Sequence, residues 1–207
     1  MADDKKFLHG AYGLNTPAAT QALYRDWAQS YEDEITANGY VTPARCAAAL
    51  AQFATDKAAP LLDIGCGTGL SGVALVAAGF STLDGTDFSP EMLALAKAKG
   101  IYRTLTLTNL NTPLPGAPAS YANAAAVGVF SPGHAPPSAL REFMAVLQPG
   151  GCLVFSLNDH ALADPTYQGA IMEQVDGGGA ELLANDYGDH LPKIGMYCRV
   201  YVLRKRK

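Results

Sequence analysis

Two carboxylates and a cluster of glycines are the residues of this chain best suited to chemistry, because they are spaced as strand ends and a tight turn would space them. Asp63 lies near the end of the short apolar run Leu-Leu-Asp-Ile, which Gly65, Gly67 and Gly69 follow. Glycine lacks the Cβ atom that would keep a ligand away from the backbone, and the segment after Gly69 is rich in good helix formers. These residues predict a strand, a turn and a helix N-terminus that can bind a ligand through backbone N–H groups.

The glycine turn is compatible with two kinds of ligand. Residues 67 to 72 match the G-x-G-x-x-G pattern of dinucleotide-binding folds, which is weak support when it stands alone. Asp63, two residues before the first glycine, would repel a pyrophosphate but would attract a positive amino group and a sulfonium. S-adenosylmethionine carries both groups, so the sequence favours this ligand over NAD.

A second carboxylate, Asp87, supports nucleoside binding. It follows a segment expected to form the next strand, and its distance from Gly69 is close to the roughly 20 residues typical of a ribose-binding acid. From a strand end, this carboxylate could accept hydrogen bonds from both ribose hydroxyls. NAD proteins share the feature, so Asp87 does not select the cofactor. The alternative is an acid that complements the dipole of the helix starting at Pro90, with Ser89 as its N-cap.

Two motifs carry a family resemblance. Residues 63 to 69 read DIGCGTG and residues 87 to 92 read DFSPEM. They resemble the first and second motifs of the class I S-adenosylmethionine-dependent methyltransferases. The resemblance covers most of the chain, from residues 26 to 32, similar to part of the N-terminal helical cap, to residues 147 to 151, similar to the turn before the fifth strand. Within the family the chain is most similar to the Williams-Beuren region methyltransferase-like group.

The resemblance and the expected strand ends together imply a set of cofactor-binding residues. Phe88 and Leu110 could sandwich the adenine or could simply pack in the core. Asn109 replaces an Asp of many relatives, but its amide oxygen can still accept from the adenine amino group. Tyr31, on one helix face with Trp27, is favoured as a lid and Trp27 as a core residue. The full set is Tyr31, Asp63, Gly65, Cys66, Gly67, Thr68, Gly69, Asp87, Phe88, Asn109, Leu110 and Gly128.

One histidine is a candidate catalytic residue. His134 lies in a Gly- and Pro-bounded loop after the expected fourth strand, on the side where relatives bring the acceptor toward the methyl group. A neutral imidazole there could accept the acceptor's proton, whereas the alternative is a loop histidine that only hydrogen-bonds the backbone. No metal is expected, because the histidines lack Cys or acidic partners at ligand spacing.

The order of strand and helix signals predicts an α/β fold: a Rossmann-like, doubly wound, seven-stranded sheet, mostly parallel with an antiparallel last strand, and helices on both faces. The expected strands cover residues 61–64, 82–86, 102–108, 124–130, 152–157, 181–186 and 196–204, and the expected helices residues 16–36, 43–54, 70–78, 90–99, 137–147 and 165–174. We expect one domain over residues 1–207, with residues 1–58 as a helical cap and 59–207 as the cofactor-binding core.

Composition agrees with a single cytoplasmic enzyme domain. The 207 residues are 49% hydrophobic and 16% charged, and no long apolar run or leader pattern is present. The net charge of −4 disfavours nucleic acid as a partner. The basic run from Arg204 to Lys207 is interpreted as a charged tail at a sheet edge. The four cysteines form no Cys-x-x-Cys pair and are expected to be buried thiols, although amides at the helix N-terminus could lower the pKa of Cys66.

Three functional hypotheses follow. The favoured one is methyl transfer from S-adenosylmethionine to a nucleophilic N, O, C or S atom of a small molecule or metabolite, by direct in-line attack. S-adenosylhomocysteine would be the product. The alternatives are a non-catalytic S-adenosylmethionine-binding regulatory protein and an NAD-dependent oxidoreductase.

Overall fold

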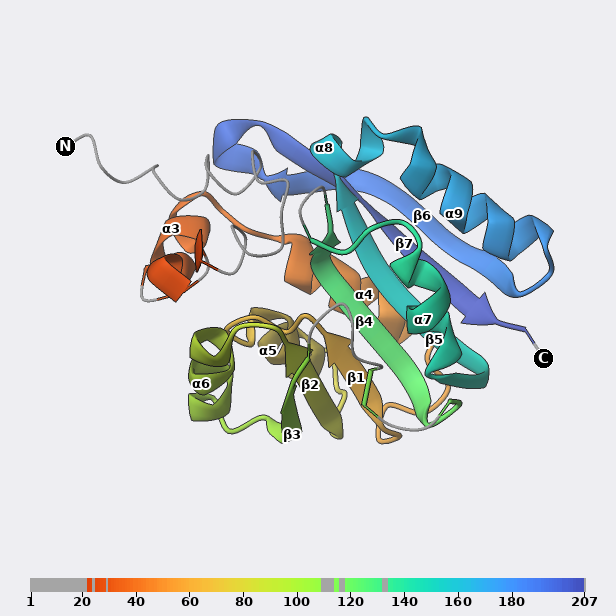
Figure 1. The fold of residues 1–207 in the computed structure, drawn as a ribbon, viewed down its shortest axis with the longest axis horizontal. Coiled ribbons are helices and arrows are strands. Elements are labelled where there is room, and N and C mark those ends of the chain that lie inside the picture. The colour runs from red at the N-terminus through yellow and green to blue at the C-terminus, as the bar shows by residue number, and fades with distance from the viewer. Residues whose placement is uncertain are drawn as a thin grey trace.

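A computed structural model (Figure 1) describes residues 22, 23, 25–28, 30–108, 114, 115, 118–131 and 134–206. Seven strands form one sheet in the order β3-β2-β1-β4-β5-β7-β6. They are β1 (Leu61–Ile64), β2 (Leu83–Asp87), β3 (Tyr102–Leu107), β4 (Tyr121–Phe130), β5 (Leu147–Asn158), β6 (Ala180–Leu191) and β7 (Met196–Lys205). β7 runs antiparallel to both neighbours and every other pairing is parallel, which confirms the predicted fold class.

Helices cover both faces of this sheet (Figure 1). The described helices are α3 (Tyr31–Ala37), α4 (Thr42–Phe53), α5 (Leu70–Ala77), α6 (Pro90–Ala98), α7 (Ala139–Ala145), α8 (Asp159–Leu162) and α9 (Pro165–Asp176), with a 3₁₀ turn at Pro192–Ile194. Apolar side chains of α4 and α5 form one core with β1, β2, β5 and β7. Those of α7 and α9 form a second core on the opposite face. The central strands β1, β4 and β5 are therefore largely buried, as expected for parallel strands covered by helices on both faces, whereas the edge strand β3 is partly exposed.

A third, smaller apolar cluster places the N-terminal helix α3 over the sheet edge. Trp27, Ile35 and Leu191 are buried in it, and Tyr31 and Leu70 pack against them. Leu70 is the first residue of α5, directly after the glycine turn. The cluster therefore brings α3 next to that turn.

Most predicted elements agree with the structure within a few residues. At the start of α6, Ser89 Oγ accepts a hydrogen bond from Met92 N at 3.2 Å and Pro90 occupies the first helical position, as predicted. The N-terminal helical region is broken, because Ala28 and Ser30 lie in turns before α3 begins. The sequence did not predict α8, and β6 extends well beyond residues 181–186.

The interpretation of the C-terminal basic run as the tail of a sheet edge is wrong. β7 lies between β5 and β6, so it is not an edge strand. Arg204 forms an ion pair with Glu181 at 3.5 Å. Lys205 Nζ donates to the carbonyl of Leu147 at 2.8 Å. These basic side chains tie neighbouring elements together rather than protecting an edge. Within the described part of the chain, no helix is both long and apolar enough to cross a membrane.

Candidate cofactor and acceptor site

The glycine turn joins β1 to α5 at the carboxyl edge of the parallel strands. Gly65, Gly67 and Gly69 have φ angles of +65°, +53° and +94°, a region that other residues rarely adopt. A Cβ atom on Gly67 would meet no atom of the described residues within 4 Å, whereas one on Gly65 would lie 2.6 Å from Val129 Cγ2. Gly65 is therefore required for packing, while the described residues leave open space above the turn at Gly67.

Asp87 ends β2 and points at this turn. Its Oδ2 accepts a hydrogen bond from Gly67 N at 2.8 Å, and its Oδ1 accepts from Ser89 N at 2.9 Å. Burial raises the pKa of the carboxyl, and these backbone donors oppose the rise. The contact with Ser89 fits the helix-start hypothesis, while the contact with Gly67 places the carboxylate beside the open space. The structure thus brings the two predicted motifs together.

Asp63 is completely buried below the turn. Its Oδ2 accepts hydrogen bonds from Ser71 Oγ and from Tyr102 Oη, each at 2.7 Å. Its Oδ1 is enclosed and has no hydrogen-bond partner among the described residues. Burial raises the pKa of Asp63 to about 6. An enclosed carboxylate oxygen without a partner is costly, so this site has capacity for one more donor.

Tyr102 explains the weak dinucleotide pattern. A Cβ on Gly72, the last glycine of that pattern, would overlap the Tyr102 hydroxyl, so Gly72 is required by the tyrosine. Sequence reasoning missed Tyr102 because no local signal marks the first residue of β3 as a partner of Asp63. The G-x-G-x-x-G match therefore reflects packing of α5 against β3.

Cys66 and Thr68 complete the turn, and both are buried. Burial raises the pKa of the Cys66 thiol, so the suggestion that helix amides lower it is wrong. The thiol stays protonated, which does not support a redox role. Within the described part of the chain, Thr68 Oγ1 is enclosed without a hydrogen-bond partner, as is Thr86 Oγ1 near the end of β2.

The remaining cofactor candidates lie around the same edge. Phe88 is half-buried directly after β2. Gly128, near the end of β4, has a φ of +71° and donates its N–H to Ser156 Oγ at 2.9 Å. Asn109 and Leu110 lie outside the described residues.

Trp27 and Tyr31, the aromatic pair of the N-terminal segment, differ in burial as the sequence suggested. Trp27 is 1% exposed and donates its indole N–H to Glu34 Oε2 at 2.7 Å. Tyr31 is half-buried, and the two ring centroids lie 4.8 Å apart. Glu32 on α3 forms an ion pair with Lys99 at 2.8 Å. These contacts hold Tyr31 close to the glycine turn.

His134 lies beyond the end of β4, where it was expected. Its Nδ1 is 2.8 Å from Ser131 Oγ, and its backbone N–H donates to the Ser131 carbonyl at 3.0 Å. The residue is half-buried. This geometry holds the ring through Nδ1. In the described part of the chain, no group of three or more His, Cys, Asp or Glu side chains could hold a metal ion.

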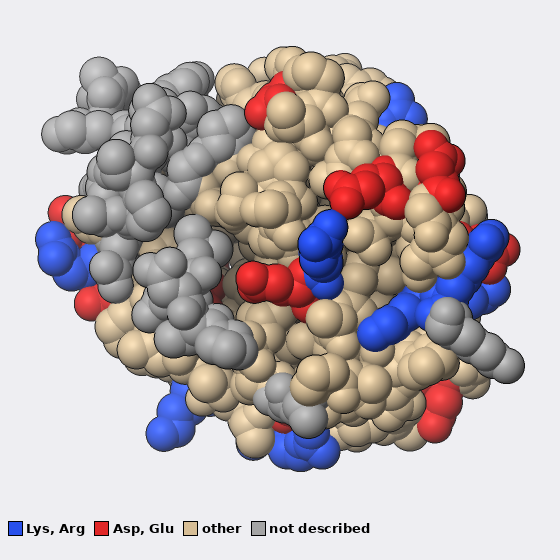
Figure 2. All heavy atoms as spheres, turned by 45° about the vertical axis from the view of Figure 1, so that its right-hand side comes forward, with Lys and Arg blue, Asp and Glu red and all other residues tan. Residues whose placement is uncertain are grey.

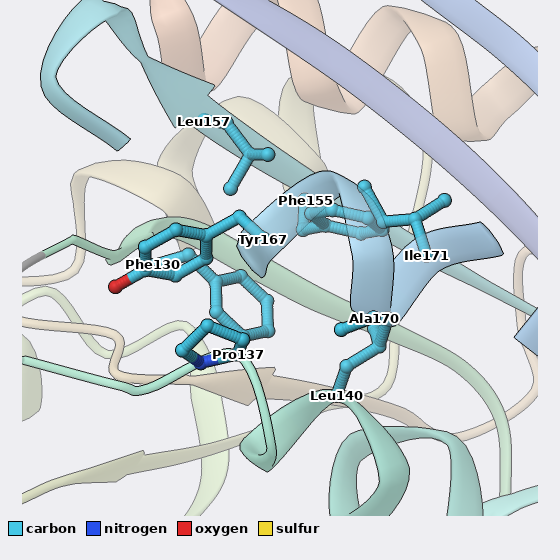
Figure 3. A pocket seen from close by; sticks show the side chains of 8 residues that line it. All are labelled: Phe130, Pro137, Leu140, Phe155, Leu157, Tyr167, Ala170 and Ile171. Atoms are coloured by element: carbon cyan, nitrogen blue, oxygen red, sulfur yellow. The ribbon is translucent and has the colours of Figure 1, made fainter. Parts of the chain in front are cut away.

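A small apolar pocket lies between α7, α9 and the sheet (Figure 3). Its lining is Phe130, Pro137, Leu140, Phe155, Leu157, Tyr167, Ala170 and Ile171. Its volume of about 10 Å³ is roughly that of one water sphere. It is a packing gap in the core and too small for a nucleoside.

Comparison with known proteins agrees with this site. Residues 61–151, which include both motifs, match the methyltransferase domain family. Human methyltransferase-like protein 27 is 32% identical over 177 residues, covering 83% of this chain and 72% of that protein. The chain belongs to the class I S-adenosylmethionine-dependent methyltransferases. It is thus an enzyme that uses S-adenosylmethionine as its cofactor.

Solved methyltransferase structures share its fold. A 1,6-didemethyltoxoflavin-N1-methyltransferase from Burkholderia thailandensis, solved with 1,6-didemethyltoxoflavin and S-adenosylhomocysteine, has a TM-score of 0.63. It is 20% identical, with 94% of this chain and 92% of that chain covered. A TehB-like methyltransferase from Corynebacterium glutamicum has a TM-score of 0.62 at 21% identity, covering 89% and 99% of the two chains. At these identities, the similarity to the two solved structures shows a shared fold alone.

Proposed function

We propose that this methyltransferase acts on a nucleophile of a small molecule or metabolite, by direct in-line attack on the methyl group. The observation that carries the proposal is the open space above Gly67, with the Asp87 carboxylate 2.8 Å from its N–H. Bound S-adenosylmethionine supplies an electrophilic methyl group on a sulfonium. The chain would then contribute mainly alignment and exclusion of water, which can lower a barrier by several kcal/mol without a covalent residue.

Each side of the turn would hold one part of the cofactor. The Asp87 carboxylate would accept hydrogen bonds from the ribose hydroxyls. The enclosed Oδ1 of Asp63 would gain the ammonium as its missing partner, directly or through a water. Gly65, Cys66, Gly67, Thr68 and Gly69 would supply the backbone of the cradle. Phe88 and Leu110 would flank the adenine, Asn109 would accept from its amino group, and Tyr31 and Gly128 would lie at the methionine end.

His134 is the proposed general base. Its Nδ1 lies 2.8 Å from Ser131 Oγ, and the imidazole would take the proton of the acceptor. Such a base contributes about 10² to 10⁴ in rate. The nature of the acceptor decides whether a base is needed at all.

The cellular setting is also a proposal. We infer a cytoplasmic enzyme whose partner is the small acceptor rather than nucleic acid, since the net charge is −4. Figure 2 shows acidic and basic side chains interspersed on one face, which does not favour a nucleic-acid-binding surface there. The same proposal includes membership in the Williams-Beuren region methyltransferase-like group. It also includes the division of the chain into a cap over residues 1–58 and a core over residues 59–207.

S-adenosylhomocysteine is expected to raise the melting temperature, whereas NADH is not. A ligand at 100 times its dissociation constant stabilises the native state by roughly 2.7 kcal/mol, which corresponds to roughly 5 to 10 °C for a domain of this size. Thermal denaturation followed by circular dichroism measures the shift. Stabilisation by NADH alone would contradict the proposal, and conversion of S-adenosylmethionine to S-adenosylhomocysteine with a methylated product would exclude a purely regulatory role.

The affinity for S-adenosylhomocysteine is expected to fall as the pH falls through 6. Burial raises the pKa of Asp63 to about 6, and an ammonium is attracted only to the ionised carboxylate. The dissociation constant should therefore rise by up to about tenfold for each pH unit below that value. Titration calorimetry near pH 8 and near pH 5 checks this. The isosteric variant Asp63→Asn should bind weakly at both pH values, and an unchanged pH profile in that variant would exclude Asp63.

A further inference from the structure

His190 lies at the same sheet edge as the glycine turn, although it is distant in sequence. β6 runs antiparallel to β7, and β7 runs antiparallel to β5, so β6 points the same way as β5 and β4. His190 is the penultimate residue of β6 and therefore lies at the carboxyl edge of the sheet. It is only 5% exposed. The expected strand over residues 181–186 ends before His190, to which the sequence analysis assigned no role.

Tyr40 connects His190 to the end of β4. The Tyr40 and His190 rings meet edge to face, with centroids 5.3 Å apart. The Tyr40 hydroxyl oxygen lies 3.1 Å from the position that a Cβ atom on Gly128 would occupy. The N–H of Val41 also donates to the His190 carbonyl at 3.2 Å. The segment before α4 thus links His190 to Gly128, one of the residues proposed for the methionine end.

A buried chain of hydrogen bonds holds the imidazole through Nδ1. This atom lies 2.7 Å from Thr42 Oγ1, which lies 3.4 Å from Cys198 Sγ. Arg45 Nη1 donates to that sulfur at 3.1 Å. Among the described residues, Thr42 is the only hydrogen-bond partner of the His190 ring. Nε2 has no hydrogen bond to them, and it is absent from the fully enclosed polar atoms that lack a partner. Nε2 is therefore the atom that is left for a ligand.

The ring is uncharged at neutral pH. Burial lowers the pKa of His190 to about 4, and the charged or titratable groups that act on it are Asp159, which opposes this, and Arg45 and His160, which add to it. A neutral imidazole forms hydrogen bonds with uncharged polar groups and does not attract an anion. When Thr42 donates to Nδ1, Nε2 carries the ring proton and can donate; when Thr42 accepts from Nδ1–H, Nε2 can accept.

We propose that His190 is a positioning residue for the methyl acceptor, and that Nε2 hydrogen-bonds an uncharged, flat nitrogen heterocycle whose ring packs against Tyr40. A heterocycle with an N–H beside a ring nitrogen satisfies either tautomer of His190. This inference rests on the proposed function, because it assumes that the acceptor binds beside the methionine end of the cofactor. It adds the chemical class of the acceptor and a residue that orients it.

Pyrazole is a suitable probe, because it is flat, uncharged and carries an N–H beside a ring nitrogen. In the full chain with isotope-labelled histidine and saturating S-adenosylhomocysteine, pyrazole should shift the His190 ring resonances saturably in NMR spectra. His190→Phe keeps a ring against Tyr40 but removes both nitrogens, so it should weaken pyrazole binding roughly 2- to 12-fold, the range for one hydrogen bond. Thr42→Val, which releases Nδ1, should weaken it less and should alter the shift at His190.

Tyr187→Phe is the matched control on the same strand. It removes a hydroxyl that donates to Asp159 at 2.8 Å, and it should leave pyrazole binding unchanged. Equal pyrazole affinity in His190→Phe and the parent, or no shift at His190 in the parent, would overturn the inference. Calorimetry with S-adenosylhomocysteine on each protein distinguishes a failure of the proposed function from a failure of the role proposed for His190. A parent that fails to bind S-adenosylhomocysteine refutes the proposed function, whereas one that binds it without a pyrazole response refutes only the role of His190.

Discussion

Replacing Asp87 with alanine should weaken S-adenosylhomocysteine binding by about 1.5 to 3 kcal/mol, roughly 10- to 150-fold in the dissociation constant, because hydrogen bonds to a charged group are lost. Asp87 is the carboxylate beside the open space at Gly67, and burial leaves it only 6% exposed. The domain should remain folded, since α6 keeps its Ser89 cap. Titration calorimetry gives the constant, and circular dichroism verifies folding.

Asp84→Ala is the matched control for this variant. Asp84 is also a buried acid of β2, but it forms an ion pair with Arg103 and accepts hydrogen bonds from Thr104 and Tyr121. Its loss should lower the stability of the domain and leave the dissociation constant unchanged. If Asp87→Ala binds as tightly as the parent, Asp87 acts only at the start of α6 and the ribose is held elsewhere.

Gly65→Ala should lower the free energy of unfolding by about 2 to 5 kcal/mol. A non-glycine residue at positive φ costs roughly 1 to 2 kcal/mol, and overpacking costs roughly 1 to 3 kcal/mol more. Both apply here, since Gly65 has a φ of +65° and its Cβ would lie 2.6 Å from Val129 Cγ2. Urea denaturation measures the change.

Gly100→Ala separates the two costs. Gly100 has the same φ of +65°, but a Cβ there would meet none of the described residues within 4 Å. Its loss of stability should therefore be confined to the backbone strain of roughly 1 to 2 kcal/mol. Equal effects of the two substitutions would show that Val129 moves aside at no cost and that Gly65 is not required for packing.

The sequence predicted the strand ends well where a glycine turn or a helix cap follows the strand. β1, an apolar run followed by Gly65, begins and ends as expected, and β2 ends at Asp87, one residue beyond its predicted end. These boundaries are local, since they depend on residues directly after the strand. The same reasoning placed Ser89 correctly as the N-cap of α6.

The sequence failed where contacts join distant segments. β6 is largely polar and half exposed, so it lacks the apolar pattern from which its full length could be read. Tyr102 reaches Asp63 only because β3 lies beside β2 in the sheet, and His190 reaches Thr42 only because β6 returns to α4. Such pairs depend on strand order and register, which no short motif encodes. The motifs therefore missed both the Tyr102–Asp63 contact and the His190–Thr42 contact.

A crystal structure of the protein with S-adenosylhomocysteine tests the central claim most directly. We expect the ribose hydroxyls within hydrogen-bond distance of the Asp87 carboxylate, the backbone of Gly67 against the ligand, and the amino group directed toward Asp63. Each Asp87 oxygen accepts one backbone hydrogen bond at present, from Gly67 N or Ser89 N, and can accept another from a ribose hydroxyl. Ligand density away from Asp87 and the glycine turn would contradict the account.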